Sequence, residues 1–208
     1  MVRVQAPAMS LQASGSLAGA LVFSSWKGRP YVRELVKPAN PKSGGQVGIR
    51  AMLRFLSQDW ENLTSGDKTT WLDRANAKVV STFNAFIGLN VYNWRDFLAP
   101  GQQDPILRTG TDSVLGTLAA VAGVRSITVT QPITTANDGW GVIFFRSPTG
   151  TFTGTFDNCK RIGKVSGTAS VVFVDSPLLP GTYYYSVRPF TKLGKLGTES
   201  AEVNATVV

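Results

Sequence analysis

The sequence contains no histidine and a single cysteine. Without histidine there is no Ser-His-Asp or Cys-His catalytic relay, no imidazole acid or base, and no zinc site with histidine ligands. One cysteine excludes an internal disulfide bond and every metal or iron–sulfur site that needs several cysteines. We therefore predict a protein that is not an enzyme, with no catalytic residue, no cofactor and no metal ligand.

Charged residues are also scarce, at 16% of the chain, and acidic residues are the rarer kind. The 21 Lys and Arg against 13 Asp and Glu give a net charge of +8 and a pI near 9.9. This positive balance comes from the small number of acids rather than from a basic tail. The composition excludes a disordered polycation.

Long apolar runs are absent as well. No segment approaches the about 18 apolar residues that a membrane helix needs, and the longest early run covers residues 17–23. The segment before this run is almost without positive charge and no small-residue cleavage site follows it, which disfavours a secretory signal. We expect a soluble protein made in the cytoplasm, without a membrane partner.

The pattern of the chain changes near residue 100. Helical periodicity precedes this point, and short β-branched and aromatic runs separated by Gly, Pro, Ser and Asn follow it. The chain-breaking residues between them are typical of a linker. We predict an α+β protein with an N-terminal arm at 1–43, a three-helix domain at 44–98, a linker at 99–113 and an all-β sandwich domain at 114–208.

The arm is predicted to contain a β-hairpin. Residues 21–26 and 31–36 have the composition of strands, and the four residues between them include Gly28 and Pro30, as in a hairpin turn. Residues 37–41 hold two prolines, each of which disfavours helix in the residue before it. We expect this last segment to be extended.

Three helices are predicted from apolar residues that recur at intervals of three or four. The first covers about residues 45–60, and the second follows a capping box that starts at Thr64 and ends at Asp67. The side chains expected to point inward are Trp71, Leu72 and Ala75 in the second helix and Val79, Phe83, Phe86, Ile87 and Trp94 in the third.

The C-terminal domain is predicted to contain seven strands. Regularly spaced short runs with turn residues between them are typical of a β-sandwich. The predicted strands cover residues 115–120, 125–130, 140–147, 169–174, 183–191 and 201–208, with one or two edge strands within 151–165.

The stretch LLPGTYYYSVRP at 178–189 resembles a corner and the strand after it in fibronectin type III domains. In that family a tyrosine hydroxyl bonds back to the corner backbone. The resemblance covers residues 114–208 and implies an immunoglobulin-like domain. It departs from the family at Gln131, where a core Trp is usual, and the corner tyrosine is Tyr183, Tyr184 or Tyr185.

Residues 20–90 are similar to a group of poorly characterised proteins from tailed phages and prophages. The similarity lies in the order and spacing of VFSSWKGRPYVR at 22–33, KPANP at 37–41, FNAF at 83–86, and Gln46, Arg50, Trp60, Leu63, Thr64, Trp71 and Ala75. This resemblance implies a virion context without an established activity. The helices that carry Trp60, Lys68 and Trp71 also resemble an HMG box, which implies DNA binding.

Other candidate chemistry is weak. No phosphate-binding loop or dinucleotide-binding fingerprint is present. Asp138, Asp157 and Asp175 lie in separate predicted turns without calcium-loop spacing, so backbone capping is the favoured interpretation. Cys159 stands beside Lys160 and Arg161, whose charges would lower the pKa of its thiol. Without a histidine base, we interpret it as an incidental thiol.

Most of the positive charge lies between residues 27 and 54, where seven Lys and Arg accompany Glu34 alone. Such an arm suits an acidic groove on a partner protein or a phosphate backbone with stacked bases. In a third interpretation, its aromatic residues pack on the helices and its charges face water. The predicted partner-binding residues are Trp26, Lys27, Arg29, Tyr31, Arg33, Lys37, Arg50 and Arg54.

We therefore expect a non-enzymatic virion protein, made in the bacterial cytoplasm, that serves as a head decoration or minor capsid protein. It would dock on phage capsid or tail proteins by its arm and helices and display the immunoglobulin-like domain. One alternative is an adaptor associated with the tail, neck or fibres. An alternative of another class is a DNA-binding protein. A homo-oligomer, and weak contact of the immunoglobulin-like domain with glycans or a host surface, stay open.

Overall fold

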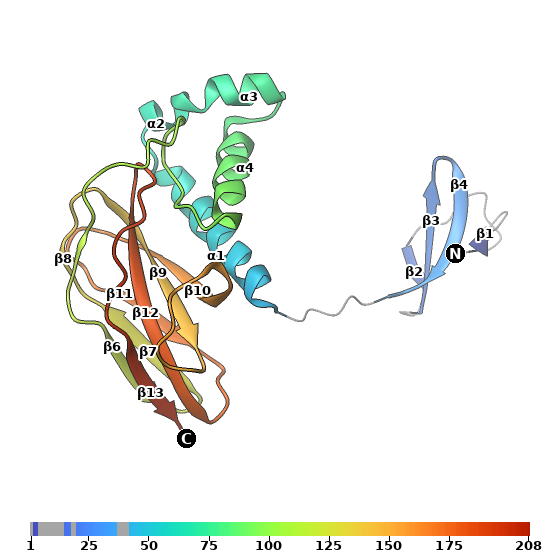
Figure 1. Ribbon diagram of the computed structural model, residues 1–208. Coiled ribbons are helices and arrows are strands. Elements are labelled where there is room, and N and C mark those ends of the chain that lie inside the picture. Colours follow the sequence, from blue (N-terminus) through green and yellow to red (C-terminus); the bar gives the residue numbers. More distant parts are fainter. Residues whose placement is uncertain (1, 4–14, 18–19, 37–41) are drawn as a thin grey trace. The chain divides into compact units, whose positions relative to one another are not determined.

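The computed structural model describes residues 2–3, 15–17, 20–36 and 42–208. The chain forms two compact units, Met1–Pro41 and Lys42–Val208 (Figure 1). The predicted end of the arm, at residue 43, lies two residues beyond the division between the units. The expectation that residues 37–41 are extended falls outside the described residues. None of the helices in the described segments has the length and apolar character needed to span a bilayer.

The first unit is an antiparallel four-stranded sheet in the order β1-β4-β3-β2. Its strands are β1 (Val2–Arg3), β2 (Gly15–Leu17), β3 (Leu21–Trp26) and β4 (Arg29–Glu34). β3 and β4 form the predicted hairpin, but its turn contains two residues, Lys27 and Gly28, rather than four. Both have positive φ, 50° and 72°, as the tight turn of a two-residue hairpin requires. Arg29 therefore belongs to β4, where it pairs with Trp26.

The second unit begins with its helices. They are α1 (Gly44–Asp59), a short 3-10 helix (Trp60–Asn62), α2 (Ser65–Thr70), α3 (Leu72–Lys78) and α4 (Thr82–Arg95). The first predicted helix is confirmed to within a residue at each end. The predicted cap is confirmed too, because Thr64 Oγ1 accepts a hydrogen bond from the N–H of Asp67 at 3.1 Å and donates one to its carboxylate at 2.7 Å.

Two residues that were expected to point inward lie at the surface. Leu72 is 46% exposed and Val79 is 91% exposed. The predicted second helix is divided at Trp71 into α2 and α3, and Val79 ends α3 in the left-handed region with a φ of 54°. Both placements were wrong because they assumed uninterrupted helices. The inward residues that are confirmed as fully buried are Trp71, Ala75, Phe86 and Trp94.

Two larger antiparallel sheets and a small one follow the helices. The strands are β5 (Val114–Leu115), β6 (Ala119–Gly123), β7 (Ser126–Gln131), β8 (Ile133–Thr135), β9 (Gly139–Ser147), β10 (Cys159–Lys164), β11 (Val171–Asp175), β12 (Gly181–Thr191) and β13 (Val203–Val207). They are ordered β10-β9-β12-β13, β11-β7-β6 and β5-β8. The α+β class is confirmed at this level, as helices combined with antiparallel sheets.

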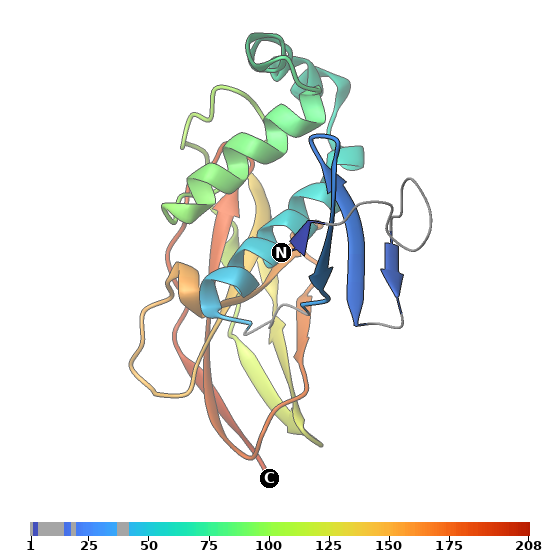
Figure 2. The ribbon, with the colours of Figure 1, turned by 90° about the vertical axis from the view of Figure 1, so that its right-hand side faces the viewer.

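The four-stranded sheet β10-β9-β12-β13 is buried on both faces, as the side chains of β9 show. Val142 and Phe144 belong to a core shared with the three-stranded sheet, whereas Ile143 and Phe145 belong to a core shared with the helices. The unit therefore has three layers, namely the helices, the sheet that contains β9, and the sheet that contains β7 (Figure 1, Figure 2).

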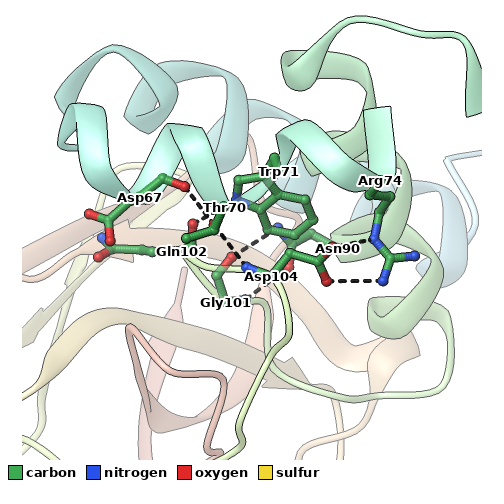
Figure 3. Close-up of polar contacts among 8 residues, drawn as sticks. All are labelled: Asp67, Thr70, Trp71, Arg74, Asn90, Gly101, Gln102 and Asp104. Carbon is green, nitrogen blue, oxygen red and sulfur yellow. Dashed lines mark hydrogen bonds and ion pairs between the residues drawn. The ribbon is translucent and has the colours of Figure 1, made fainter. Parts of the chain in front are cut away.

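Residues 99–113 do not separate two domains. Asn90 on α4 exchanges two side-chain hydrogen bonds with the backbone of Gly101, at 2.8 and 3.0 Å. Arg74 on α3 forms a bidentate ion pair with Asp104, with N–O distances of 2.7 and 2.9 Å (Figure 3). Because these contacts join the segment to the helices, and the helices share a core with β9, the structure differs here from the predicted boundary between a helical domain and a sandwich.

A buried carboxylate also connects the helices to the sheet. Asp59, at the end of α1, is 3% exposed. It accepts hydrogen bonds from the indole N–H of Trp140 on β9 and from the ammonium group of Lys164 on β10. The side-chain amide of Asn62 donates a third, at 3.2 Å. A buried charge is tolerated when its lone pairs are satisfied in this way.

Replacing Asp59 by Ala should therefore lower the free energy of unfolding by about 2–4 kcal/mol, because it leaves the buried indole N–H without its acceptor and removes the ion pair with Lys164. Urea unfolding followed by tryptophan fluorescence measures this loss. Lys192→Ala removes an exposed ion pair to Asp138 and is the matched control, since exposed pairs stabilise little. Equal stabilities for the two variants would contradict this role of Asp59.

Candidate functional site

The hairpin of the first unit gathers four of the predicted partner-binding residues on one face. Residues directly opposite in an antiparallel pair point to the same side, and neighbours along a strand alternate. The pairs Trp26–Arg29, Ser24–Tyr31 and Val22–Arg33 therefore lie on one face. We call Trp26, Arg29, Tyr31 and Arg33 the hairpin face.

The hairpin face presents cations beside aromatic rings. Trp26 is 63% exposed, and Lys27 in the turn places its ammonium group 4.8 Å from the centre of the indole ring. Arg29 and Arg33 are exposed and Tyr31 is half-buried. This combination can pair with carboxylates or phosphates while its rings bury apolar surface.

Lys27 lies in the turn beside this face. Arg50 and Arg54 lie on α1, in the second compact unit, and Lys37 lies outside the described residues. The single arm predicted from charge is therefore two surfaces, each carried by its own unit. The expectation that Trp26 and Tyr31 pack on the helices stays a prediction.

A second basic surface is a groove of about 220 Å³ between α1 and β10. We call it the basic groove. Arg50 and Arg54 line it from α1, and Lys160 and Arg161 line it from β10, with Lys42 at the start of the unit. Sequence reasoning missed both β10 residues as part of a basic site, because they are more than 100 positions from α1 and no local pattern shows that β10 packs against that helix.

Burial and nearby positive charges disfavour the charged forms of Arg161 and Lys160 in the basic groove. Burial lowers the pKa of Arg161, and the positive charge of Arg54 lowers it further. Burial also lowers the pKa of Lys160, and the charge of Arg146 adds to this effect against smaller opposing effects from acidic groups. A bound anion would relieve this repulsion. The groove is therefore suited to binding phosphate or carboxylate groups.

Two of the three candidate carboxylates, Asp138 and Asp175, have different partners. Asp138 accepts a hydrogen bond from the backbone N–H of Thr111 at 3.0 Å, which is the main reason that its pKa is lowered. Asp175 instead accepts from Arg146 and from the buried Tyr185 hydroxyl. The described residues contain no group of three His, Cys, Asp or Glu that could hold a metal ion.

Cys159 is fully buried at the start of β10. Burial is the main influence on its thiol and raises the pKa to about 12, whereas the charge of Lys160 lowers it by less. The expectation of a lowered pKa was therefore wrong, because neighbours in sequence do not offset the loss of water around the thiolate. This thiol is not a nucleophile at neutral pH.

A larger hollow, of about 550 Å³, lies beside β5 and the segment that leads to β13. Two carboxylates line it. Asp112 forms an ion pair with Lys195 through Oδ2 at 3.2 Å, and its buried Oδ1 accepts no hydrogen bond from the described residues. Glu199 accepts hydrogen bonds from the backbone N–H of Gly154 and the hydroxyl of Ser186. These contacts stabilise loops, and we assign no chemistry to the hollow.

The burial of Cys159 predicts that the folded protein resists alkylation by iodoacetamide at pH 8. The unfolded protein in urea should react fully, because its thiol then regains an ordinary pKa. Mass spectrometry of the intact protein counts the modified molecules. Rapid alkylation of the folded protein would contradict the burial and the raised pKa.

The basic groove predicts stabilisation by multivalent anions. Pyrophosphate should raise the melting temperature of the wild-type chain by about 2–4 °C, equivalent to about 1 kcal/mol of binding to the folded state. The Arg54→Ser, Arg161→Ser double variant should lose this shift, and the exposed Lys78→Ser variant should keep it. Calorimetry at constant ionic strength separates binding from general screening. An unchanged shift in the double variant would place the anion elsewhere.

No family model and no curated protein matches the chain. Three of the solved structures that resemble the chain each match about half of it. A β-1,2-glucanase from Parabacteroides distasonis is 18% identical with a TM-score of 0.37, and the match covers 48% of this chain and 13% of the enzyme. A family 76 glycoside hydrolase from a bovine Bacteroides thetaiotaomicron strain is 10% identical with a TM-score of 0.34, over 45% and 20% of the two chains.

The third structure is a PKD domain of an M14-like peptidase from a Thermoplasmatales archaeon. It is 15% identical with a TM-score of 0.33, and the match covers 48% of this chain and 98% of that domain. The present chain spans only a small part of the two hydrolases. At these identities and TM-scores the similarities carry no argument about function.

Proposed function

We propose that the chain is a non-enzymatic structural protein of a phage particle, a head decoration or minor capsid protein. It docks by its N-terminal sheet and helices and displays an immunoglobulin-like domain. The observation that carries this proposal is the hairpin face, where Trp26, Arg29, Tyr31 and Arg33 share one side of a compact unit. The similarity of residues 20–90 to phage and prophage proteins gives the particle context.

The chemistry of the hairpin face supports a protein partner. Trp, Tyr and Arg are the residues that most often dominate the binding energy of protein interfaces. Arg29 and Arg33 can each form two parallel hydrogen bonds to a carboxylate, and the ring of Trp26 can bury apolar surface beside them. The partner surface on the capsid or tail protein would then be acidic with an apolar centre.

The immunoglobulin-like assignment, of the fibronectin type III kind, is supported by a corner contact. The hydroxyl of Tyr183 donates to the backbone carbonyl of Leu179 at 3.1 Å, which is the type of bond expected of a corner tyrosine. Tyr185 is buried and bonds to Asp175 instead. A four-stranded and a three-stranded antiparallel sheet around one core are also consistent with this class.

DNA binding is the second candidate, and the basic groove favours it. Its five cationic side chains, two on α1, two on β10 and Lys42 before α1, could contact phosphates. The helical residues behind the HMG-box resemblance give less support, since Leu63, Trp71 and Ala75 are buried in the core that the helices share with the sheet. An adaptor of the tail, neck or fibres would use the same surfaces as a head protein, and the particle experiment below includes it.

The proposal predicts that the protein is present in purified particles and attaches through the hairpin face. An Arg29→Glu, Arg33→Glu double variant should bind particles that lack the protein at least about tenfold more weakly than wild type, which corresponds to about 1.4 kcal/mol. Lys78→Glu, Lys192→Glu is the matched control with the same change in charge. Mass spectrometry of the particles and a pelleting assay make the measurement, and cryo-electron microscopy distinguishes head from tail.

Absence of the protein from particles would contradict the virion role. Equal binding by the double variant and the control would contradict the hairpin face as the docking surface. DNA binding makes a different prediction, a fall in affinity with a log–log salt slope of about −0.9 per phosphate contacted. The Arg54→Ser, Arg161→Ser variant should reduce that slope, and the absence of any duplex affinity would exclude this candidate.

A further inference from the structure

A hollow of about 530 Å³ lies between the first half of α1 and the end of α4. Arg50 lines both this hollow and the basic groove. We call this hollow the apolar groove. Its apolar lining comes from Ile49, Leu53 and Phe156, and two arginines, Arg50 and Arg95, also line it. A volume of this size accommodates one or two large side chains of a bound segment.

Glycines in α1 set the position of Phe156. A Cβ on Gly44 would stand 2.3 Å from the backbone oxygen of Asp157, and a Cβ on Gly48 would stand 2.9 Å from that of Phe156. Only helix residues without a side chain allow the 3-10 turn Phe156–Asn158 to lie this close to α1. The ring of Phe156 also packs against Trp94, with ring centres 5.7 Å apart. The apolar lining is therefore pre-organised, which reduces the entropy lost on binding.

The charged residues that line the apolar groove are positive. Arg50 and Arg95 line it, and the first turn of α1 has the sequence GGQV, without an acidic residue. The positive end of the helix dipole adds to their field. On the far side of Arg50, the basic groove contributes Arg54 and Arg161. Asp157, close to Gly45, is an acidic neighbour.

We propose that the apolar groove binds an acidic peptide segment of a partner protein, in which a Leu, Ile or Phe is flanked by Asp or Glu. The large side chain would contact Ile49, Leu53 and Phe156, and a flanking carboxylate would pair with Arg95. A nucleic-acid backbone fits less well, because it offers charge without a branched apolar side chain for this lining. The inference goes beyond the proposed function, since it applies whether or not the chain is part of a particle.

The test uses the full chain and a short fluorescent peptide that alternates Glu-Glu with Leu-Phe. One control peptide has Lys in place of Glu, and another has Ser in place of Leu and Phe. Fluorescence anisotropy should show binding of the first peptide, with both controls at least about tenfold weaker. Arg95→Glu and Leu53→Ser should each weaken the first peptide by a similar factor. Lys78→Glu, with a matched reversal of charge on α3, should not.

A second measurement keeps the inference testable if a variant fails to fold. In the wild-type chain, the peptide should shift the backbone amide NMR signals of Gly45, Leu53 and Phe156 more than those of the hairpin face. Equal affinity for the Ser-containing peptide would overturn the inference, as would full binding by folded Arg95→Glu. Shifts confined to other surfaces would overturn it too. If duplex DNA displaces the peptide, and Leu53→Ser does not change the affinity for that DNA, the surface is assigned to nucleic acid instead.

Discussion

The helices cover the outer face of the sheet that contains β9, and the rest of the second unit depends on this contact. Phe55 on α1 meets Trp140 on β9 and Phe190 on β12, with ring centres 5.0 and 5.4 Å apart, and the two strand residues are themselves 5.8 Å apart. Each such side chain stabilises the fold by about 2–3 kcal/mol when fully buried. Separating the layers would expose all three, so neither layer is an independent domain.

The same contact creates both surfaces of α1. Because α1 is fixed against β10, Arg54 approaches Arg161 and the basic groove forms. Because its glycine face is fixed against the turn at Phe156, the apolar groove forms on the other side. The positions of these charges are therefore set by core packing and by the buried bonds of Asp59, rather than by contacts among the charges themselves.

Local features of this fold were predictable from sequence. The spacing of Ile49 and Leu53 located α1, the hydroxyl and carboxylate of Thr64 and Asp67 located the start of α2, and alternation located β7. Contacts between segments that are far apart in the sequence were not predictable. The continuous apolar run of β9 is typical of a strand buried on both faces, yet nothing local identifies the helices as its second cover. For the same reason Lys160 could not be joined to the α1 cations, and the contacts of residues 101–104 with the helices could not be recognised.

The helices and sheets of the second unit should open together, because the helices share one core with the sheet that contains β9. Native-state hydrogen exchange of the full chain, followed by NMR, tests this directly. We expect the slowest amides of α1, α4, β9 and β12 to share one opening free energy, equal to the global free energy of unfolding. Exchange of the helices at a much lower free energy, with β9 and β12 still protected, would instead show that the helices and the sheets are two independent domains.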